Sequence, residues 1–173
     1  MSNKDILRVG LIGCGRAGSI HAGNFAQRVP QAALVAVCDP VEDAAKKLAD
    51  DLHVNNVYTS HLDLINDKNV DAVVIVVPTD LHMQMAIDAA NAGKHILCEK
   101  PMAMNIAECE KMIEAADNNN VKLQLGFMRR FDSSFVSAKA MVDAGEIGDI
   151  VYIRSNTRGP SKPRPWMYDI TAS

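Results

Sequence analysis

Short, almost continuously apolar runs alternate with segments of helical periodicity up to residue 125, and this alternation constrains the fold more than any other feature. The predicted strands are residues 8–13, 33–38, 57–58, 72–77, 95–98 and 121–125, and the predicted helices are residues 17–27, 41–51, 61–66, 81–92 and 106–116. Alternating strands and helices give a parallel sheet, and strands covered on both faces must be apolar throughout. We therefore predict an α/β fold with a doubly wound parallel sheet.

Composition makes several classes of protein poor candidates. The 18 Lys and Arg against 21 Asp and Glu give a formal net charge of -3, and no basic cluster is longer than Arg129-Arg130, so nucleic acid is not an expected partner. The longest apolar run, residues 72–77, is too short to cross a bilayer, and the first residues lack an apolar signal core. We expect a cytoplasmic protein with no membrane partner.

The four cysteines show no pattern of a metal or redox site. Cys14, Cys38, Cys98 and Cys109 stand at irregular spacings, with no CxxC pair and no histidine at zinc spacing. We predict reduced thiols that are buried as small apolar side chains, and no metal site.

A GxGxxG motif follows the first predicted strand, with its glycines at Gly13, Gly15 and Gly18. The first glycine allows a tight turn, the second lets the backbone approach a pyrophosphate, and the third lets the helix pack closely on the strand. Arg16 and Ala17 lie where the helix starts, and its first N–H groups favour phosphate. The motif predicts a dinucleotide site of the Rossmann type, the alternative being a strand–helix junction that binds nothing.

Asp39 ends the second predicted strand, about 20 residues after the last glycine of the motif, where a carboxylate accepts hydrogen bonds from the adenosine ribose. A 2′-phosphate would meet like charge there, and Pro40 and Val41 supply no arginine to compensate. This position predicts NAD as the cofactor, preferred over NADP.

Glu99, Lys100 and Pro101 follow the fifth predicted strand, at the sheet edge where α/β proteins bind ligands. A partly buried lysine beside a bound cofactor is a candidate acceptor for the proton of a substrate hydroxyl. The alternative is an ordinary surface ion pair between Glu99 and Lys100, and the residues alone leave both readings open. His82 follows the fourth strand at the same edge, where a lone histidine is more often structural than catalytic.

Several motifs together resemble one family. They are the glycine motif with His21 close behind it, Asp39, residues 78–82, Gly93-Lys-His95, Glu99-Lys-Pro101 and residues 126–131, together with the Arg-Arg-Phe-Asp stretch at residues 129–132. This set resembles the Gfo/Idh/MocA family of sugar and polyol dehydrogenases, and most of all its inositol 2-dehydrogenase branch.

The resemblance implies roles for individual residues. Lys100 is expected to be the catalytic lysine, with a Lys100–Pro101 peptide that is often cis in the family. The other residues expected to line the cofactor site are Pro78, Thr79, His82, Glu99 and Pro101, in addition to Gly13, Gly15, Arg16, Ala17, Gly18 and Asp39. Arg129 or Arg130 is expected to approach the nicotinamide or the substrate.

The resemblance also implies two domains. We expect an NAD-binding Rossmann domain over residues 1–125, and over residues 126–173 the beginning of an incomplete C-terminal α/β domain for substrate binding and oligomerisation. The latter region offers one predicted helix, residues 134–144, and one predicted strand, residues 149–154, which do not make a domain. The complete protein is expected to be a homo-oligomer.

The resulting prediction is an NAD-dependent oxidoreductase that moves hydride from a secondary hydroxyl of an inositol-like polyol or sugar to nicotinamide, present here mainly as its cofactor-binding half. One alternative is a non-catalytic NAD-binding module or a truncated fragment. Another is a related dehydrogenase that acts on an aldose, a dihydrodiol or another carbonyl and alcohol pair, because specificity depends on the site and not on the fold.

Overall fold

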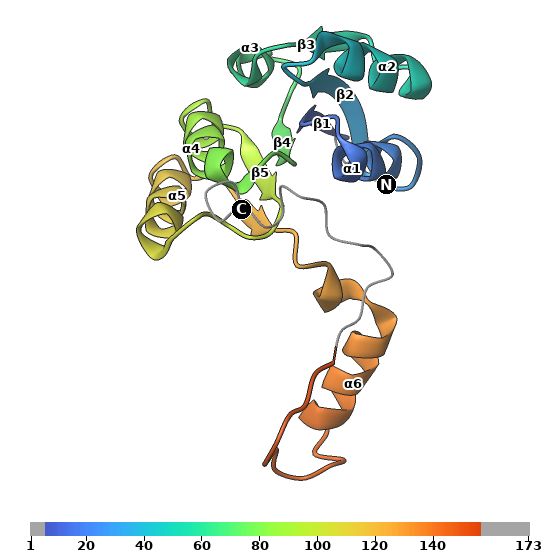
Figure 1. Cartoon of the computed structure of the whole chain (residues 1–173), viewed down its shortest axis with the longest axis vertical. Helices are drawn as coiled ribbons and strands as arrows, with labels where there is room; N and C mark the ends of the chain where they lie inside the picture. The colour runs from blue at the N-terminus through green and yellow to red at the C-terminus, as the bar shows by residue number, and fades with distance from the viewer. Residues whose placement is uncertain (1–5, 157–173) are drawn as a thin grey trace. The chain divides into compact units, whose positions relative to one another are not determined.

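The computed structural model describes residues 6–156, and within them the sheet has six strands, all parallel, in the order β3-β2-β1-β4-β5-β6 (Figure 1). The strands are β1 (Leu7–Ile12), β2 (Ala32–Cys38), β3 (Asn56–Tyr58), β4 (Ala72–Ile75), β5 (His95–Cys98) and β6 (Leu123–Leu125). The order is that of dinucleotide-binding sheets, so the predicted doubly wound sheet of the Rossmann type is confirmed.

Five helices connect these strands. They are α1 (Arg16–Gln27), α2 (Glu42–Leu52), α3 (His61–Asn66), α4 (His82–Asn91) and α5 (Ile106–Asn118), with a 3-10 turn η1 (Thr79–Leu81) ahead of α4. The ends of the predicted elements agree with these bounds to within two residues. The main difference is that β4 ends at Ile75, because the chain leaves the sheet before Pro78, which has no N–H for a ladder bond.

The helices form a layer on each face of the sheet (Figure 1). On one face, Leu11 and Val37 of the strands pack with Ala22 of α1 and Leu48 and Ala49 of α2. The other face packs strand residues such as Val73 and Ile75 against α3, α4 and α5, through Leu64, Ala89 and Met112. Burial of each large apolar side chain contributes about 1.5–3 kcal/mol, so the continuous apolar strands hold this three-layer arrangement together.

The described residues divide into two units, the first ending at Gly126 and the second beginning at Phe127. The second unit contains a 3-10 turn η2 (Met128–Phe131) and helix α6 (Ser133–Asp143), which begins where the Asp132 side chain accepts a hydrogen bond from the Ser134 N–H. The prediction of a strand over residues 149–154 is wrong, because these residues form no regular structure. A strand needs a pairing partner, and the described part of this unit contains none.

Three of the four cysteines lie in the core as free thiols. Cys14, Cys38 and Cys98 are buried, and burial raises the pKa of each to about 12. They are therefore neutral and unreactive near pH 7, as predicted. For Cys109 the predicted burial is wrong in degree: it lies one turn nearer the start of α5 than the buried Met112 and is only partly covered.

Within residues 6–156, none of the helices combines the length and the apolar character that crossing a membrane requires.

Candidate functional site

The carboxyl ends of β1 and β4 mark the place where the winding of the sheet reverses. The chain leaves β1 toward α1 on one face, and it leaves β4 toward η1 and α4 on the opposite face. Diverging connections open a crevice at this edge, where α/β proteins bind their ligands. Strands β2 and β5 end at the same edge, and the loops that follow them carry Asp39 and Lys100, respectively.

The glycine turn after β1 leaves no room for side chains at two of its three glycines. Gly13 has a φ of 100°, and a Cβ there would lie 2.1 Å from the Val76 carbonyl oxygen. At Gly18 a Cβ would lie 1.9 Å from the Gly13 carbonyl oxygen. The turn therefore packs on the end of β4, and α1 packs on the turn.

Gly15 differs from its two neighbours in the motif. A Cβ there would have nothing within 4 Å, so the backbone borders open space. Gly15 is also the N-cap of α1, and no side chain caps that helix. The first-turn N–H groups, which Arg16 and Ala17 help to supply, are thus available to an anion such as a pyrophosphate.

Asp39 is fastened to the glycine turn. Its Oδ2 accepts a hydrogen bond of 2.8 Å from the Cys14 N–H, and its Oδ1 accepts one of 2.9 Å from the Val41 N–H. Each oxygen of a carboxylate can accept more than one hydrogen bond, so this side chain keeps capacity for two ribose hydroxyls. The open backbone at Gly15 and this carboxylate fit the pyrophosphate and the ribose of a dinucleotide.

Lys100 lies in the loop after β5, with its side chain exposed. The Glu99 N–H donates to the Ile75 carbonyl oxygen over 3.0 Å, which ties the loop to β4, and the Lys100–Pro101 peptide bond is cis. The expected partial burial of Lys100 is not found, because among residues 6–156 no side chain covers it. The alternative of an ion pair with Glu99 is also wrong, since the ion pairs of the described residues do not include Lys100.

Glu99 instead pairs with His21 of α1. His21 Nε2 lies 2.8 Å from Glu99 Oε1, and both side chains are about three-quarters buried. From the sequence, His21 is expected only as part of the resemblance, and no role is predicted for it. Helical periodicity offered a signal, because His21 lies three residues after Gly18, on the side of α1 that faces the strand.

His82 connects the loops after β4 and β5. Its side chain is 1% exposed, with Nδ1 2.9 Å from the Pro101 carbonyl oxygen and Nε2 3.0 Å from the Val77 carbonyl oxygen. A neutral imidazole has one N–H and donates to one of these oxygens at a time. Thr79 is buried beside it in η1, whereas Pro78 is exposed. The interpretation of His82 as structural fits this buried position.

Arg129 and Arg130 belong to the second unit. The Arg129 guanidinium donates to Asp132 Oδ2 over 3.1 Å and stacks 5.3 Å from the centre of the Phe135 ring. Their approach to nicotinamide or substrate stays a prediction.

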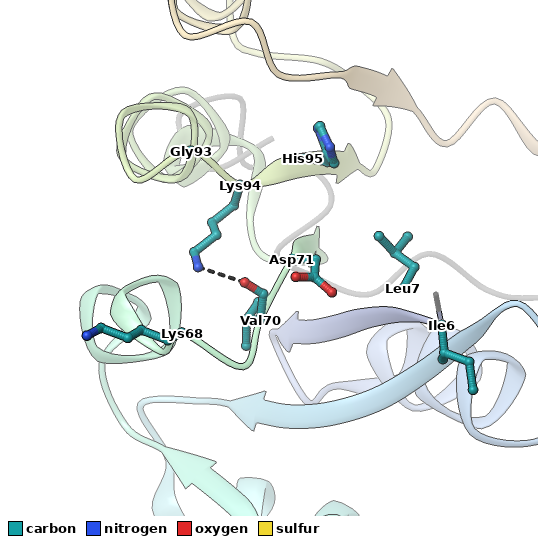
Figure 2. Close-up of a pocket in the computed structure, with 8 residues that line it drawn as sticks. All are labelled: Ile6, Leu7, Lys68, Val70, Asp71, Gly93, Lys94 and His95. Carbon is teal, nitrogen blue, oxygen red and sulfur yellow. Dashed lines mark hydrogen bonds between the residues drawn. The ribbon is translucent and has the colours of Figure 1, made fainter. Parts of the chain in front are cut away.

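A hollow of about 490 Å³ lies at the opposite, amino-terminal edge of the sheet (Figure 2). Its lining includes Lys94, whose Nζ donates to the Asp67 and Val70 carbonyl oxygens over 3.0 and 2.7 Å. Asp71, also in the lining, pairs with Arg8 over 2.6 Å. These polar groups are bound to the protein itself, and the hollow lies away from every predicted site residue, so we do not assign a ligand to it. The described residues contain no cluster of three or more His, Cys, Asp or Glu side chains able to hold a metal ion.

A family described as an oxidoreductase family with an NAD-binding Rossmann fold matches residues 7–127. The match covers β1 to β6 and the loops after β1, β2, β4 and β5 that border the crevice. This chain belongs to the Gfo/Idh/MocA family. The glycine turn, Asp39 and Lys100 all lie inside the part that matches.

Known members of the Gfo/Idh/MocA family include inositol dehydrogenases that resemble this chain. The myo-inositol 2-dehydrogenase of Thermotoga maritima is 40% identical over 157 residues, which are 91% of this chain and 47% of that protein. The NAD(+)-dependent scyllo-inositol 2-dehydrogenase of Bacillus subtilis is 39% identical over 157 residues, 91% of this chain and 46% of that protein. The chain therefore spans less than half the length of these relatives.

Solved structures of family members show the same fold. Scyllo-inositol dehydrogenase from Lactobacillus casei, with bound NAD(H) and scyllo-inositol, has a TM-score of 0.81 and 39% identity, over 84% of this chain and 43% of that one. The WlbA dehydrogenase of Bordetella pertussis, in complex with NADH and UDP-GlcNAcA, has a TM-score of 0.78 and 32% identity, over 83% and 43%. The chain thus contains the NAD-binding Rossmann domain of this oxidoreductase family, and that domain is similar to the corresponding part of these solved structures.

Proposed function

We propose that this chain provides the cofactor-binding and proton-accepting part of an enzyme that oxidises a secondary hydroxyl of an inositol-like polyol or sugar. The observation that carries the proposal is the convergence of the open glycine turn, Asp39 and Lys100 on one crevice at the sheet edge. The similarity to two inositol dehydrogenases supports the substrate class.

The crevice offers a different contact to each part of the cofactor. The N–H groups at the start of α1 bind the pyrophosphate, and Asp39 accepts from the ribose hydroxyls. The loops after β4 and β5, joined by His82, border the nicotinamide end. The full set proposed for the cofactor is Gly13, Gly15, Arg16, Ala17, Gly18, Asp39, Pro78, Thr79, His82, Glu99, Lys100 and Pro101.

NAD is the proposed cofactor, and we propose that it is preferred over NADP. A 2′-phosphate on the adenosine ribose would stand beside the Asp39 carboxylate, and like charges repel. Pro40 and Val41 follow Asp39 and contribute no cation to offset this repulsion.

Lys100 is the proposed acceptor of the substrate's hydroxyl proton. Nicotinamide, when bound, supplies the hydride acceptor. Because a lysine accepts a proton only in its neutral form, the absence of Lys100 from the ion pairs among residues 6–156 favours this role. Arg129 or Arg130 is the proposed contact to the substrate, and the whole protein is proposed to be a homo-oligomer in the cytoplasm, where its four free cysteines stay reduced.

A second function has an observation in its favour. A related dehydrogenase acting on another sugar, an aldose or a dihydrodiol is favoured by the likeness to WlbA, whose structure contains UDP-GlcNAcA.

Calorimetric titration of this 173-residue chain with NAD and with NADP tests the cofactor proposal. We expect saturable NAD binding, at least tenfold tighter than NADP binding. Equal affinities would contradict the charge argument at Asp39, and no binding of either cofactor would contradict the proposed site.

The substrate proposal is tested on the protein that carries this chain, at its natural length. NADH formation is followed at 340 nm with myo-inositol, scyllo-inositol, glucose and a dihydrodiol. NADH formation from the inositols supports the proposed inositol-like substrate. NADH formation from glucose or the dihydrodiol supports the related dehydrogenase, and no NADH formation from any of them supports a non-catalytic NAD-binding module.

A further inference from the structure

The carboxylate of Glu99 is held from three sides. Its Oε1 lies 2.8 Å from His21 Nε2, and its Oε2 accepts a 3.0 Å hydrogen bond from the Lys100 N–H. On the third side lies Gly126, where a Cβ would come within 3.1 Å of Oε1, so the absence of a side chain leaves space for the carboxylate. The Glu99 carboxylate thus contacts helix α1 and the loop after β5, and it lies beside Gly126, the first residue after β6.

These contacts connect the two chemically distinct ends of the proposed cofactor site. Helix α1 begins at the glycine turn, the proposed site of the pyrophosphate, whereas Lys100 is the proposed proton acceptor at the reacting end. The Lys100 N–H donates to the Glu99 carboxylate, and His21 contacts the same carboxylate. The pair of His21 and Glu99 therefore fixes the position of the start of this loop relative to α1.

The pairing also decides the electrostatic environment of Lys100. A carboxylate on the preceding residue is a natural partner for a lysine ammonium, and such a pair favours the charged form. Here His21 and the Lys100 N–H hold the Glu99 carboxylate in place, and the described ion pairs do not include the Lys100 ammonium. The other titratable side chains described nearby are the buried Cys98, which precedes Glu99, and His82, which contacts Pro101.

We infer that His21 is a positioning residue for Lys100: it holds the Glu99 carboxylate on α1 and so keeps it from becoming the ion-pair partner of the lysine. This inference rests on the proposed role of Lys100 as proton acceptor. It predicts that the loss of His21 converts Glu99 into a partner that keeps Lys100 protonated.

The molecule contains a matched control for this pair. His61 Nε2 lies 2.9 Å from Asp88 Oδ2, with side-chain exposures of 22% and 21%, against 24% and 23% for His21 and Glu99. His61 lies on α3 and Asp88 on α4, and neither belongs to the proposed cofactor site. Replacement of His61 therefore removes an equivalent contact without touching Lys100.

Competitive acetylation at pH 8, read by mass spectrometry, measures the neutral fraction of Lys100 against the exposed Lys122 as an internal reference. His21→Leu is expected to lower the relative reactivity of Lys100 roughly threefold to tenfold, the consequence of a new ion pair with Glu99. His21→Gln keeps an N–H donor and should retain the parent reactivity, and so should His61→Leu. Adding Glu99→Gln to His21→Leu should restore the reactivity, because the charge is gone.

The inference is overturned if His21→Leu leaves the Lys100 reactivity at the parent value, or if the double variant stays as low as the single one. Kinetics of the protein at its natural length add a second reading. For His21→Leu, the pH at which kcat/KM reaches half its maximum should rise by about one unit, with the Kd for NAD within threefold of the parent. A protein without dehydrogenase activity would refute the proposed function, while the acetylation result would still decide the role of His21.

Discussion

The two edges of the sheet use polar side chains in opposite ways. At the carboxyl edge, the backbone at Gly15 borders open space, Asp39 retains unused acceptor capacity and Lys100 has no described ion pair. At the amino edge, Lys94 is bound to two carbonyl oxygens and Asp71 is bound to Arg8. The difference teaches that a hollow lined by polar groups is not by itself a binding site. In the hollow at the amino edge, the polar groups of Lys94 and Asp71 are already bound to the protein (Figure 2).

The largest effect on activity is expected at Lys100, because its place at the carboxyl edge predicts a role in the reaction and no role in stabilising the fold. Lys100→Met should lower kcat by roughly a thousandfold, because the proton acceptor is lost. The Kd for NAD, measured by calorimetry, should stay within threefold. Lys94→Met at the other edge is the control, with an unchanged kcat and a lower Tm, since two carbonyl oxygens lose their donor. A kcat for Lys100→Met near that of the parent would remove Lys100 from the mechanism.

The glycine turn provides the next largest effect. Gly13→Ala places a Cβ 2.1 Å from a carbonyl oxygen at a φ of 100°, so the turn has to move. We expect NAD binding to weaken by roughly a hundredfold and the free energy of unfolding to fall by about 2–4 kcal/mol.

Gly23→Ala is the matched control for the glycine turn. Gly23 lies inside α1 with nothing within 4 Å of an added Cβ, so alanine should stabilise the helix by about 0.5–1 kcal/mol. Urea unfolding and calorimetry measure both variants. Equal NAD affinities for the two would show that the shape of the turn is not required for binding.

A smaller effect on cofactor binding is expected at Asp39. A substitution there can remove the negative charge and keep a hydrogen-bond acceptor. Asp39→Asn keeps one side-chain acceptor for the Cys14 or the Val41 N–H but removes the negative charge. NADP binding should tighten by roughly tenfold, because the repulsion of the 2′-phosphate is lost, while NAD binding weakens by a few-fold. Titrations with both cofactors measure the change. An unaltered preference between NAD and NADP would place the discrimination elsewhere.

Much of this comparison was predictable from the sequence. The six strands follow from their continuous apolar runs, and the GxGxxG spacing predicted the turn that packs on β4. The carboxyl edge could be identified because parallel strands all end at the same side of the sheet. The assignment of residues 1–125 and 126–173 to a cofactor domain and a substrate domain, and the individual cofactor roles, stay predictions.

Contacts between distant residues were not predictable. His21 and Glu99 stand 78 positions apart, and no local pattern reports that a helix and a later loop bring them together. The same is true of Lys100, whose exposure depends on what covers it and not on its own neighbours in the chain. The failed strand over residues 149–154 had the composition of a strand, but a strand forms only where a partner strand is present.

The smallest effect is expected at the amino edge, in the pair of Arg8 and Asp71. The hydrogen bonds from Arg8 lower the pKa of Asp71 below its usual range, so the carboxylate is stabilised in the folded state. The stabilisation is complete above the pKa of Asp71 in the unfolded chain and disappears as the pH falls through the lowered pKa. The side chains of Arg8 and Asp71 are 40% and 34% exposed, so screening by water keeps the effect on stability small.

Asp71→Asn should lower Tm by about 2–4 °C at pH 7, and the difference in Tm from the parent should shrink below about pH 4. Thermal melts from pH 2.5 to 7 measure this, and NAD affinity should not change. Weaker NAD binding in this variant would break the distinction between a stabilising edge and a binding edge.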